Sequence, residues 1–312
     1  MNIRYSLVVP VYNEAGSVRL LYEEITPVML GLSQEGESDY ELIFVDDGST
    51  DPTPREIAAL AETDSRVRLV RLRHNLGKSA AYSAGFAAAR GDVIVTLDGD
   101  LQDDPRFIPS LLDVLQQGFD LVVGWKQNRL ENEPAKTLSS RIFNSLKRLV
   151  FGLRLHDSNS GFRAMRGTVA RSLQLHGDMY RFIPELAARQ GFRVTEIPVI
   201  HRRRRFGESK YGPGRFWTGL LDLLSVRFLT GYIHKPLHFF GTLGLLPLLV
   251  GLGLEFYVLV RKLFGSRFQT HLAALIIGVL LIMVGVQLIA IGLIGEMIRA
   301  VANERGGSLH ED

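Results

Sequence analysis

Short apolar runs alternate with amphipathic stretches over about the first 200 residues of the chain. Runs rich in Val, Ile and Leu that end at turn-forming residues predict β-strands, and stretches with apolar residues three or four positions apart predict helices. The predicted strands cover residues 6–12, 40–45, 67–72, 92–97, 121–124 and 194–199. The predicted helices cover residues 17–30, 53–61, 79–89, 105–116 and 137–150. Because apolar strands alternate with helices, we expect an α/β fold with a mostly parallel sheet covered by helices on both faces.

The last third of the chain has a different pattern. Residues 236–260 and 272–294 form two apolar stretches, each long enough to cross a bilayer core of about 30 Å. A buried helical hairpin in a soluble protein is the alternative, but the lengths and the short basic linker 261–271 favour membrane helices. We expect an α/β domain at 1–212, interfacial amphipathic helices at 213–235, a transmembrane hairpin at 236–298 and a tail at 299–312.

Charge and glycine placement predict how these parts are arranged in a membrane. Eight Lys or Arg residues lie in 202–235, against three in the linker 261–271. The positive-inside rule therefore predicts a multi-pass protein of the cell (inner) membrane whose α/β domain and tail are cytoplasmic. Gly278, Gly285 and Gly292 line one face of the second helix. This face could pack against the first helix or against a second copy of the chain, which leaves a homo-oligomer open.

Composition excludes some classes of function. The net charge is only +3, and the basic residues are clustered rather than spread over the chain, so we do not expect nucleic-acid binding. The chain has no cysteine, which excludes disulfides and thiolate metal sites.

Polar clusters follow three of the predicted strands, at 13–14, 46–49 and 98–100. Ligands of parallel sheets bind at the carboxyl ends of the strands, so the clusters predict one binding rim. Asp98 and Asp100 are two residues apart and can converge, and Gln102 adds a neutral oxygen. Such oxygen ligands suit Mg²⁺ or Mn²⁺, whereas an acidic solvated turn is the alternative for Asp-Gly-Asp alone.

Five segments resemble the motifs of family 2 glycosyltransferases with the Rossmann-like GT-A fold. They are Pro-Val-Tyr-Asn-Glu at 10–14, Val-Asp-Asp-Gly-Ser-Thr-Asp at 45–51, Asp-Gly-Asp-Leu-Gln at 98–102, Asp-Ser-Asn-Ser-Gly-Phe-Arg at 157–163 and Arg-Arg-Phe-Gly-Glu-Ser-Lys-Tyr at 204–211. The last two are similar to those of polyprenyl-phosphate sugar transferases, the dolichol-phosphate mannose synthase group and its bacterial undecaprenyl-phosphate relatives. The two C-terminal apolar stretches match the bacterial relatives.

The resemblance implies a role for each matching residue. The implied metal ligands are Asp98, Asp100 and Gln102. The implied donor-binding residues are Pro10, Tyr12, Glu14, Val45, Asp47, Asp98, Gly99, Asp100 and Lys126. The implied acceptor-phosphate residues are Ser160, Arg163, Arg204 and Lys210, and the last three are expected to act in catalysis together with Asp98 and Asp100. Lys126 stands where the family often has arginine, and it lacks the bidentate fork of that side chain.

The expected activity is metal-dependent, inverting transfer of a hexose-type sugar from a UDP- or GDP-sugar to a polyprenyl phosphate. A lipid phosphate is largely anionic near neutral pH, so it can attack the anomeric carbon without a general base. A processive polysaccharide synthase is disfavoured because the chain lacks a Gln-x-x-Arg-Trp motif. A nucleotidyltransferase would need a glycine-rich, lysine-bearing loop near the N-terminus, which is also missing. A non-catalytic membrane scaffold or sugar-lipid binding subunit is the remaining alternative.

Overall fold

The structure is a computed structural model that describes residues 3–32, 39–126, 151–202, 235–265 and 271–307. The chain divides into two compact units, 1–224 and 225–312, and each is described by itself. The predicted helix at 137–150 and the predicted interfacial segment up to residue 234 lie outside the described residues.

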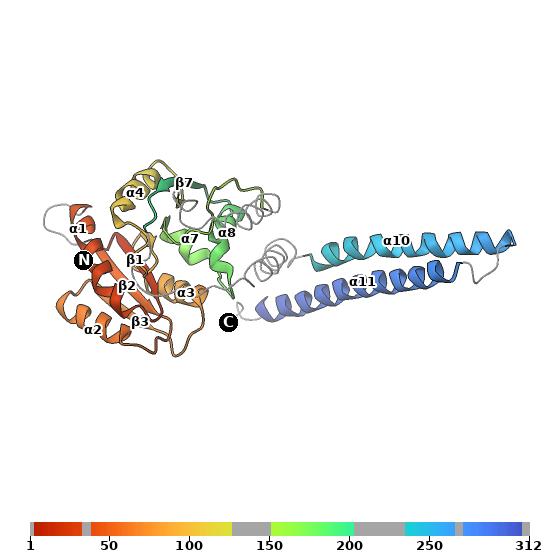
Figure 1. Ribbon diagram of the computed structural model, residues 1–312, viewed down its shortest axis with the longest axis horizontal. Helices are drawn as coiled ribbons and strands as arrows, with labels where there is room; N and C mark the ends of the chain where they lie inside the picture. Colours follow the sequence, from red (N-terminus) through yellow and green to blue (C-terminus); the bar gives the residue numbers. More distant parts are fainter. Residues whose placement is uncertain (1–2, 33–38, 127–150, 203–234, 266–270, 308–312) are drawn as a thin grey trace. The chain divides into compact units, whose positions relative to one another are not determined.

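The first unit is built on one seven-stranded sheet (Figure 1). Its strands are β1 (Tyr5–Val11), β2 (Tyr40–Asp46), β3 (Val67–Arg71), β4 (Val93–Thr96), β5 (Leu121–Lys126), β6 (Arg163–Arg166) and β7 (Val194–Val199), in the order β3-β2-β1-β4-β6-β5-β7. Strands β3, β2, β1 and β4 are parallel neighbours, and β5 is parallel to β7. Strand β6 runs antiparallel between β4 and β5. The predicted mostly parallel sheet is confirmed, and β6 is the strand that was not predicted.

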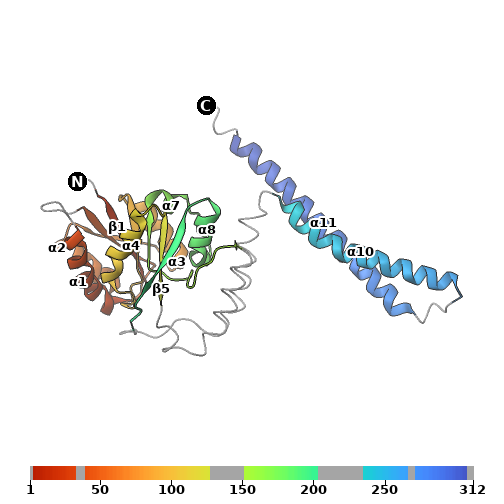
Figure 2. The same ribbon diagram turned by 90° about the horizontal axis from the view of Figure 1, so that it is seen from above.

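Helices cover both faces of this sheet (Figure 2). One layer contains α1 (Ala15–Leu32), α2 (Thr53–Thr63) and α4 (Ile108–Gln116), and the other contains α3 (Lys78–Ala88), α7 (Gly167–Ser172) and α8 (Ile183–Arg189). The predicted helix at 105–116 divides into a 3₁₀ turn, η1 (Pro105–Phe107), followed by α4. A second 3₁₀ turn, η2 (Met179–Phe182), precedes α8.

The two faces of β1 show why consecutive residues of this strand are apolar. Leu7 and Val9 belong to the core cluster that includes the buried residues of α1 and α4. Val8 points to the opposite face, where a Cβ on Gly85 of α3 would overlap its side chain. A glycine at this point of α3 lets the helix backbone approach the sheet closely.

The second unit contains two long helices that run side by side, α10 (Pro236–Leu263) and α11 (Leu272–Gly307) (Figure 1). Residues 236–263 and 272–298 are long and apolar enough to cross a membrane. The glycine face of α11 is turned toward α10. A Cβ on Gly285 would lie 2.7 Å from the Gly244 carbonyl oxygen, and one on Gly251 would lie 2.6 Å from the Gly278 carbonyl oxygen. Of the two partners left open by the sequence, the structure therefore supports the neighbouring helix.

Candidate active site

The polar clusters after β1, β2 and β4 lie next to one another, as the sequence predicts. The Asp47 N–H donates to the Val11 carbonyl at 2.9 Å, and the Asn13 N–H donates to the Ser49 hydroxyl at 2.9 Å. On the other side, a Cβ on Gly99 would overlap the Val11 side chain. The ends of three neighbouring parallel strands thus form one polar rim.

The loop after β1 is held against the loop after β2. Asn13 has a left-handed backbone (φ 54°), and its side-chain oxygen accepts the Thr50 N–H at 2.9 Å. The Glu14 N–H donates to the Thr53 hydroxyl at 2.8 Å. Pro10, Tyr12 and Glu14, the residues expected to bind the nucleoside, are half-buried at the end of β1 and on this loop. Their role toward a nucleoside stays a prediction.

Asp47 fastens the loop that leads into α3. Its carboxylate accepts the Leu76 N–H at 2.8 Å and the Gly77 N–H at 3.0 Å. Burial raises the pKa of Asp47, and these two hydrogen bonds oppose that rise. Val45 is fully buried, and its side chain faces Gly85 of α3. Donor contacts by Asp47 and Val45 also stay predictions.

The Asp98–Gln102 motif has a fixed backbone. Leu101 is left-handed (φ 61°), and the Asp100 carboxylate accepts the Gln102 N–H at 3.2 Å. The Gln102 amide nitrogen donates to the Arg202 carbonyl at 3.3 Å, so its oxygen is the end left for a ligand. Asp98, Asp100 and this amide oxygen suit a hard cation.

These ligands alone do not complete a metal site. The part of the chain that the structure describes contains no group of three or more His, Cys, Asp or Glu side chains placed to hold a metal ion. Mg²⁺ and Mn²⁺ commonly use one or two carboxylates together with water and substrate phosphate oxygens. The residues present therefore fit a metal that binds together with a phosphorylated ligand.

Lys78, at the start of α3, is a rim residue that the sequence analysis missed. Its Nζ lies 2.6 Å from Asp98 Oδ1, and each side chain keeps about a quarter of its surface exposed (23% and 24%). Burial alone would lower the pKa of Lys78, but the Asp98 carboxylate raises it well above its usual value. Burial likewise opposes ionisation of Asp98, while Lys78 lowers its pKa below the usual value. The strand-end rule, applied to the loop after β3, would have pointed to this lysine.

Asp103 supports the Asp98–Gln102 motif. Its carboxylate accepts the Asp98 N–H at 3.1 Å and pairs with Lys126 Nζ at 3.1 Å. His201 Nδ1 lies 3.8 Å from the same carboxylate. Burial opposes ionisation of Asp103, but Lys126 and His201 hold its pKa well below its usual value. Lys126 was expected to contact the donor diphosphate, and the structure shows its ammonium paired with Asp103; the donor contact stays a prediction.

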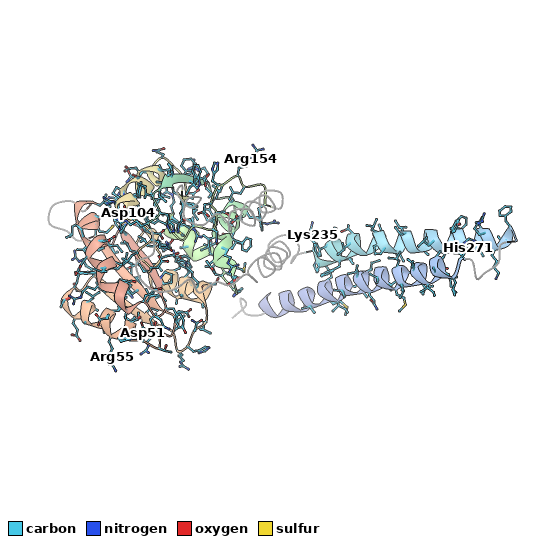
Figure 3. The ribbon with its side chains drawn as sticks, viewed as in Figure 1. Asp51, Arg55, Asp104, Arg154, Lys235 and His271 are labelled. Carbon is cyan, nitrogen blue, oxygen red and sulfur yellow. The ribbon has the colours of Figure 1, made fainter. Side chains whose placement is uncertain are left out.

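Asp104, labelled in Figure 3, extends this set of contacts to Arg202. It pairs with Arg106 at 2.6 Å and with Arg202 at 2.8 Å, although Asp104 itself is almost fully buried. Arg202 also pairs with Glu24 of α1 at 2.5 Å. The sequence identified Asp98, Asp100 and Gln102, but it missed the two following aspartates as the residues that support them.

The Asp-Ser-Asn-Ser-Gly-Phe-Arg segment passes beside Asp98. The Thr96 hydroxyl donates to the Gly161 carbonyl at 2.6 Å, and a Cβ on Gly161 would overlap the Asp98 carboxylate. Ser160 and Arg163 are buried, and the Arg163 guanidinium donates to the Tyr180 carbonyl at 3.3 Å. The other two expected acceptor-phosphate residues, Arg204 and Lys210, lie outside the described residues. The grouping of these four residues around a phosphate stays a prediction.

Comparison with known proteins identifies the family. Residues 6–173 match the model of glycosyl transferase family 2. A dodecaprenyl-phosphate galacturonate synthase of Rhizobium johnstonii is 38% identical over 95% of this chain and 88% of its own length. An undecaprenyl-phosphate 4-deoxy-4-formamido-L-arabinose transferase of Sodalis glossinidius is 33% identical over 96% of this chain and 90% of its own length.

A solved structure shares the fold. Glucosyl-3-phosphoglycerate synthase of Mycobacterium tuberculosis, solved with Mn²⁺ and UDP-glucose, superposes with a TM-score of 0.54 at 21% identity, over 72% of this chain and 79% of its own. Because the family model spans more than half of the chain and relatives align over nearly all of it, this chain is a glycosyltransferase of family 2, and its sheet has the expected GT-A fold.

Proposed function

We propose that the chain transfers a hexose-type sugar from a nucleotide-sugar donor to a polyprenyl phosphate, in a reaction that depends on Mg²⁺ or Mn²⁺. One observation carries the proposal: a rim with Asp98, Asp100 and Gln102 occurs in a chain that matches polyprenyl-phosphate sugar transferases over nearly its full length. The sugars named for the two relatives differ from each other, so the relatives support the acceptor class more than the donor sugar.

In this proposal an oxygen of the lipid phosphate attacks the anomeric carbon as the bond from that carbon to the donor diphosphate breaks. The sugar becomes linked to the lipid phosphate with inverted configuration, and the nucleoside diphosphate leaves. The bound metal would neutralise charge on the leaving diphosphate. Asp98, Asp100 and the Gln102 amide oxygen would hold that metal. No proton has to leave the nucleophile, so the rim needs alignment and charge rather than a general base.

The second unit supports a reaction at a membrane. Helices α10 and α11 have the length and composition of membrane spans, and a polyprenyl acceptor resides in a bilayer. The excess of Lys and Arg before α10 favours a cytoplasmic catalytic unit at the inner face of the cell membrane. In this proposal Ser160, Arg204 and Lys210 would hold the acceptor phosphate, and Arg163, which is fully buried, would stabilise that phosphate through its charge.

A panel of radiolabelled UDP- and GDP-sugars tests the proposal. Full-length protein in nanodiscs is mixed with undecaprenyl phosphate and each donor, in the presence of Mg²⁺, Mn²⁺ or EDTA. We expect a labelled lipid from at least one donor and none with EDTA. A folded protein that gives no labelled lipid, and that shows no metal-dependent nucleotide affinity, would instead support a non-catalytic membrane scaffold.

A further inference from the structure

Lys78 is placed to contact more than Asp98. It begins α3, and its Nζ lies 5.7 Å from the centre of the Tyr82 ring and 5.3 Å from the centre of the Tyr180 ring. Among the described residues, Asp98 is the one hydrogen-bond partner of this ammonium, which has three N–H donors. The two aromatic rings hold the ammonium in place, and its partial exposure leaves donors available to a ligand at the rim.

A second cation lies on the same face of the sheet. Arg163 of β6 is paired with Thr96 of β4, and directly opposed residues in an antiparallel pair point to the same face. Asp98 follows Thr96 by two residues and shares that face, on which Lys78 reaches it. Lys78, Arg163 and the Asp98 carboxylate therefore lie on the face of the sheet that α3 covers.

Arg163 has little compensation for its charge. The side chain is fully buried, and its Nε and Nη1 have no hydrogen-bond partner among the described residues. Its guanidinium donates to the Tyr180 carbonyl but forms no ion pair with a described carboxylate. The Tyr82 hydroxyl, also buried, has no hydrogen-bond partner there either. A buried uncompensated cation is unfavourable, so this region favours an additional anion close by.

We propose that Lys78 binds a carboxylate of the donor sugar, so that the enzyme selects a uronic acid over the corresponding neutral hexose. This inference rests on the proposed function, in which the motif containing Asp98 binds the donor diphosphate to which the sugar is joined. A group next to Asp98 is therefore near the sugar. Lys78 makes the contact, whereas Arg163 is sealed from solvent and acts through its charge. A charge-assisted hydrogen bond to a carboxylate is about twice as strong as one to a neutral hydroxyl.

Donors that differ only at C6 test the selection. UDP-galacturonate is compared with UDP-galactose, and UDP-glucuronate with UDP-glucose, by calorimetric titration of the full-length protein in nanodiscs with Mn²⁺. The same comparison is made with GDP-mannuronate and GDP-mannose. Of the carboxylate donors, we expect the one with the highest affinity to bind at least about tenfold more tightly than the matching neutral donor. Transfer to undecaprenyl phosphate, measured as kcat/KM, should show the same preference.

Variants at Lys78, with one control variant, assign the effect. Lys78→Met should reduce the C6 preference to about twofold or less, and Lys78→Arg should retain most of it, because the charge is kept. Arg55→Met is the control: it removes an exposed cation from α2, outside the rim, and should leave the C6 preference as in wild type. Thermal melts establish that each variant is folded. If a variant does not fold, the comparison of donors with the wild-type protein still tests the inference.

The inference would be overturned if neutral donors bind as tightly as the matching uronic-acid donors. It would also be overturned if the C6 preference survives in Lys78→Met. A third contrary result would be a Lys78→Met variant that loses affinity for undecaprenyl phosphate while its C6 preference is unchanged. The last result would assign this cation to the acceptor phosphate. Efficient transfer of neutral hexoses would reject the inference and keep the proposed function. Tight binding of a carboxylate donor without transfer to any polyprenyl phosphate would reject the proposed function and keep the inference about Lys78.

Discussion

The two units of this chain achieve a unique structure by different means. In the first, charged side chains of the rim contact specific partners, such as Lys78 with Asp98 and Lys126 with Asp103. In the second, glycines allow the backbones of α10 and α11 to meet, as at Gly244 and Gly285. Charge pairs fix the positions of atoms that act on a ligand, whereas small residues in an apolar hairpin fix only how two helices pack. The difference predicts which substitutions should impair chemistry and which should impair packing alone.

The largest effect should come from Asp100→Ala. Loss of a metal-binding carboxylate should reduce transfer about 10³-fold or more, since the metal supplies several kcal/mol of charge stabilisation. Binding of Mn²⁺, followed by electron paramagnetic resonance, should weaken in parallel. Asp113→Ala removes an exposed carboxylate from α4 and serves as the control, with activity close to wild type. Wild-type turnover with bound metal in Asp100→Ala would contradict the role assigned to this residue.

Asp103→Asn should mainly lower stability. It leaves the Lys126 ammonium, whose side chain is only 10% exposed, without its counter-charge, which typically costs about 3–5 kcal/mol. Thermal melts should show a large fall in the unfolding midpoint, and adding Lys126→Met should recover part of it. Asp113→Asn, on the surface of α4, should change stability by about 0.5 kcal/mol or less. If the loss of stability in the double variant equals the sum of the losses in the two single variants, Asp103 and Lys126 are not coupled.

In the hairpin, Gly251→Leu and Gly253→Leu form a matched pair. A side chain at Gly251 would overlap the Gly278 carbonyl, whereas Gly253 has no neighbouring atom within 4 Å. Gly251→Leu should destabilise helix packing by about 1–3 kcal/mol, and Gly253→Leu should have little effect. The chain has no cysteine, so disulfide cross-linking of cysteines introduced into α10 and α11 reports the packing directly. Equal cross-linking in the two variants would show that the glycines do not set the helix contact.

The smallest effect should appear in acid, and only in the sheet unit. The Arg66 guanidinium beside Asp64 lowers the pKa of that carboxyl from 3.8 to about 2. A lowered folded-state pKa contributes stability that is complete above pH 3.8 and is lost as the pH falls toward 2. Asp64→Asn should remove at most about 2 kcal/mol of this pH-dependent stability. Thermal melts at pH 5 and pH 2.5 check this: wild type should lose more stability than Asp64→Asn, and identical losses would argue against the pair.

Much of the fold follows from the sequence because parallel strands buried on both faces contain continuous apolar runs, such as residues 7–11 of β1 and 42–45 of β2. Strand β6 escaped prediction because it is four residues long and begins and ends with arginine. Only its partners β4 and β5, which are distant in sequence, make it a strand. No local pattern contains that information.

The rim was predictable to a similar extent. Strand ends located Asp98 and Asp100, and the structure places the intervening Gly99 against Val11 at the end of β1. Lys78 was missed because a lysine at the start of a helix is common, and only the folded sheet brings it to Asp98. Asp103 and Lys126 were each visible in the sequence, but their pairing depends on the contact between the end of β5 and the loop after β4.

The central claim is that a lipid phosphate, activated by no general base, receives the sugar at this rim. The most direct test compares undecaprenyl phosphate with undecaprenol as acceptors for full-length protein in nanodiscs, with a radiolabelled panel of UDP- and GDP-sugars including uronic acids, and with Mn²⁺ or EDTA. The account predicts a labelled lipid only from the phosphate and only with metal. A glycosylated product from undecaprenol, or transfer to the phosphate that persists in EDTA, would contradict it.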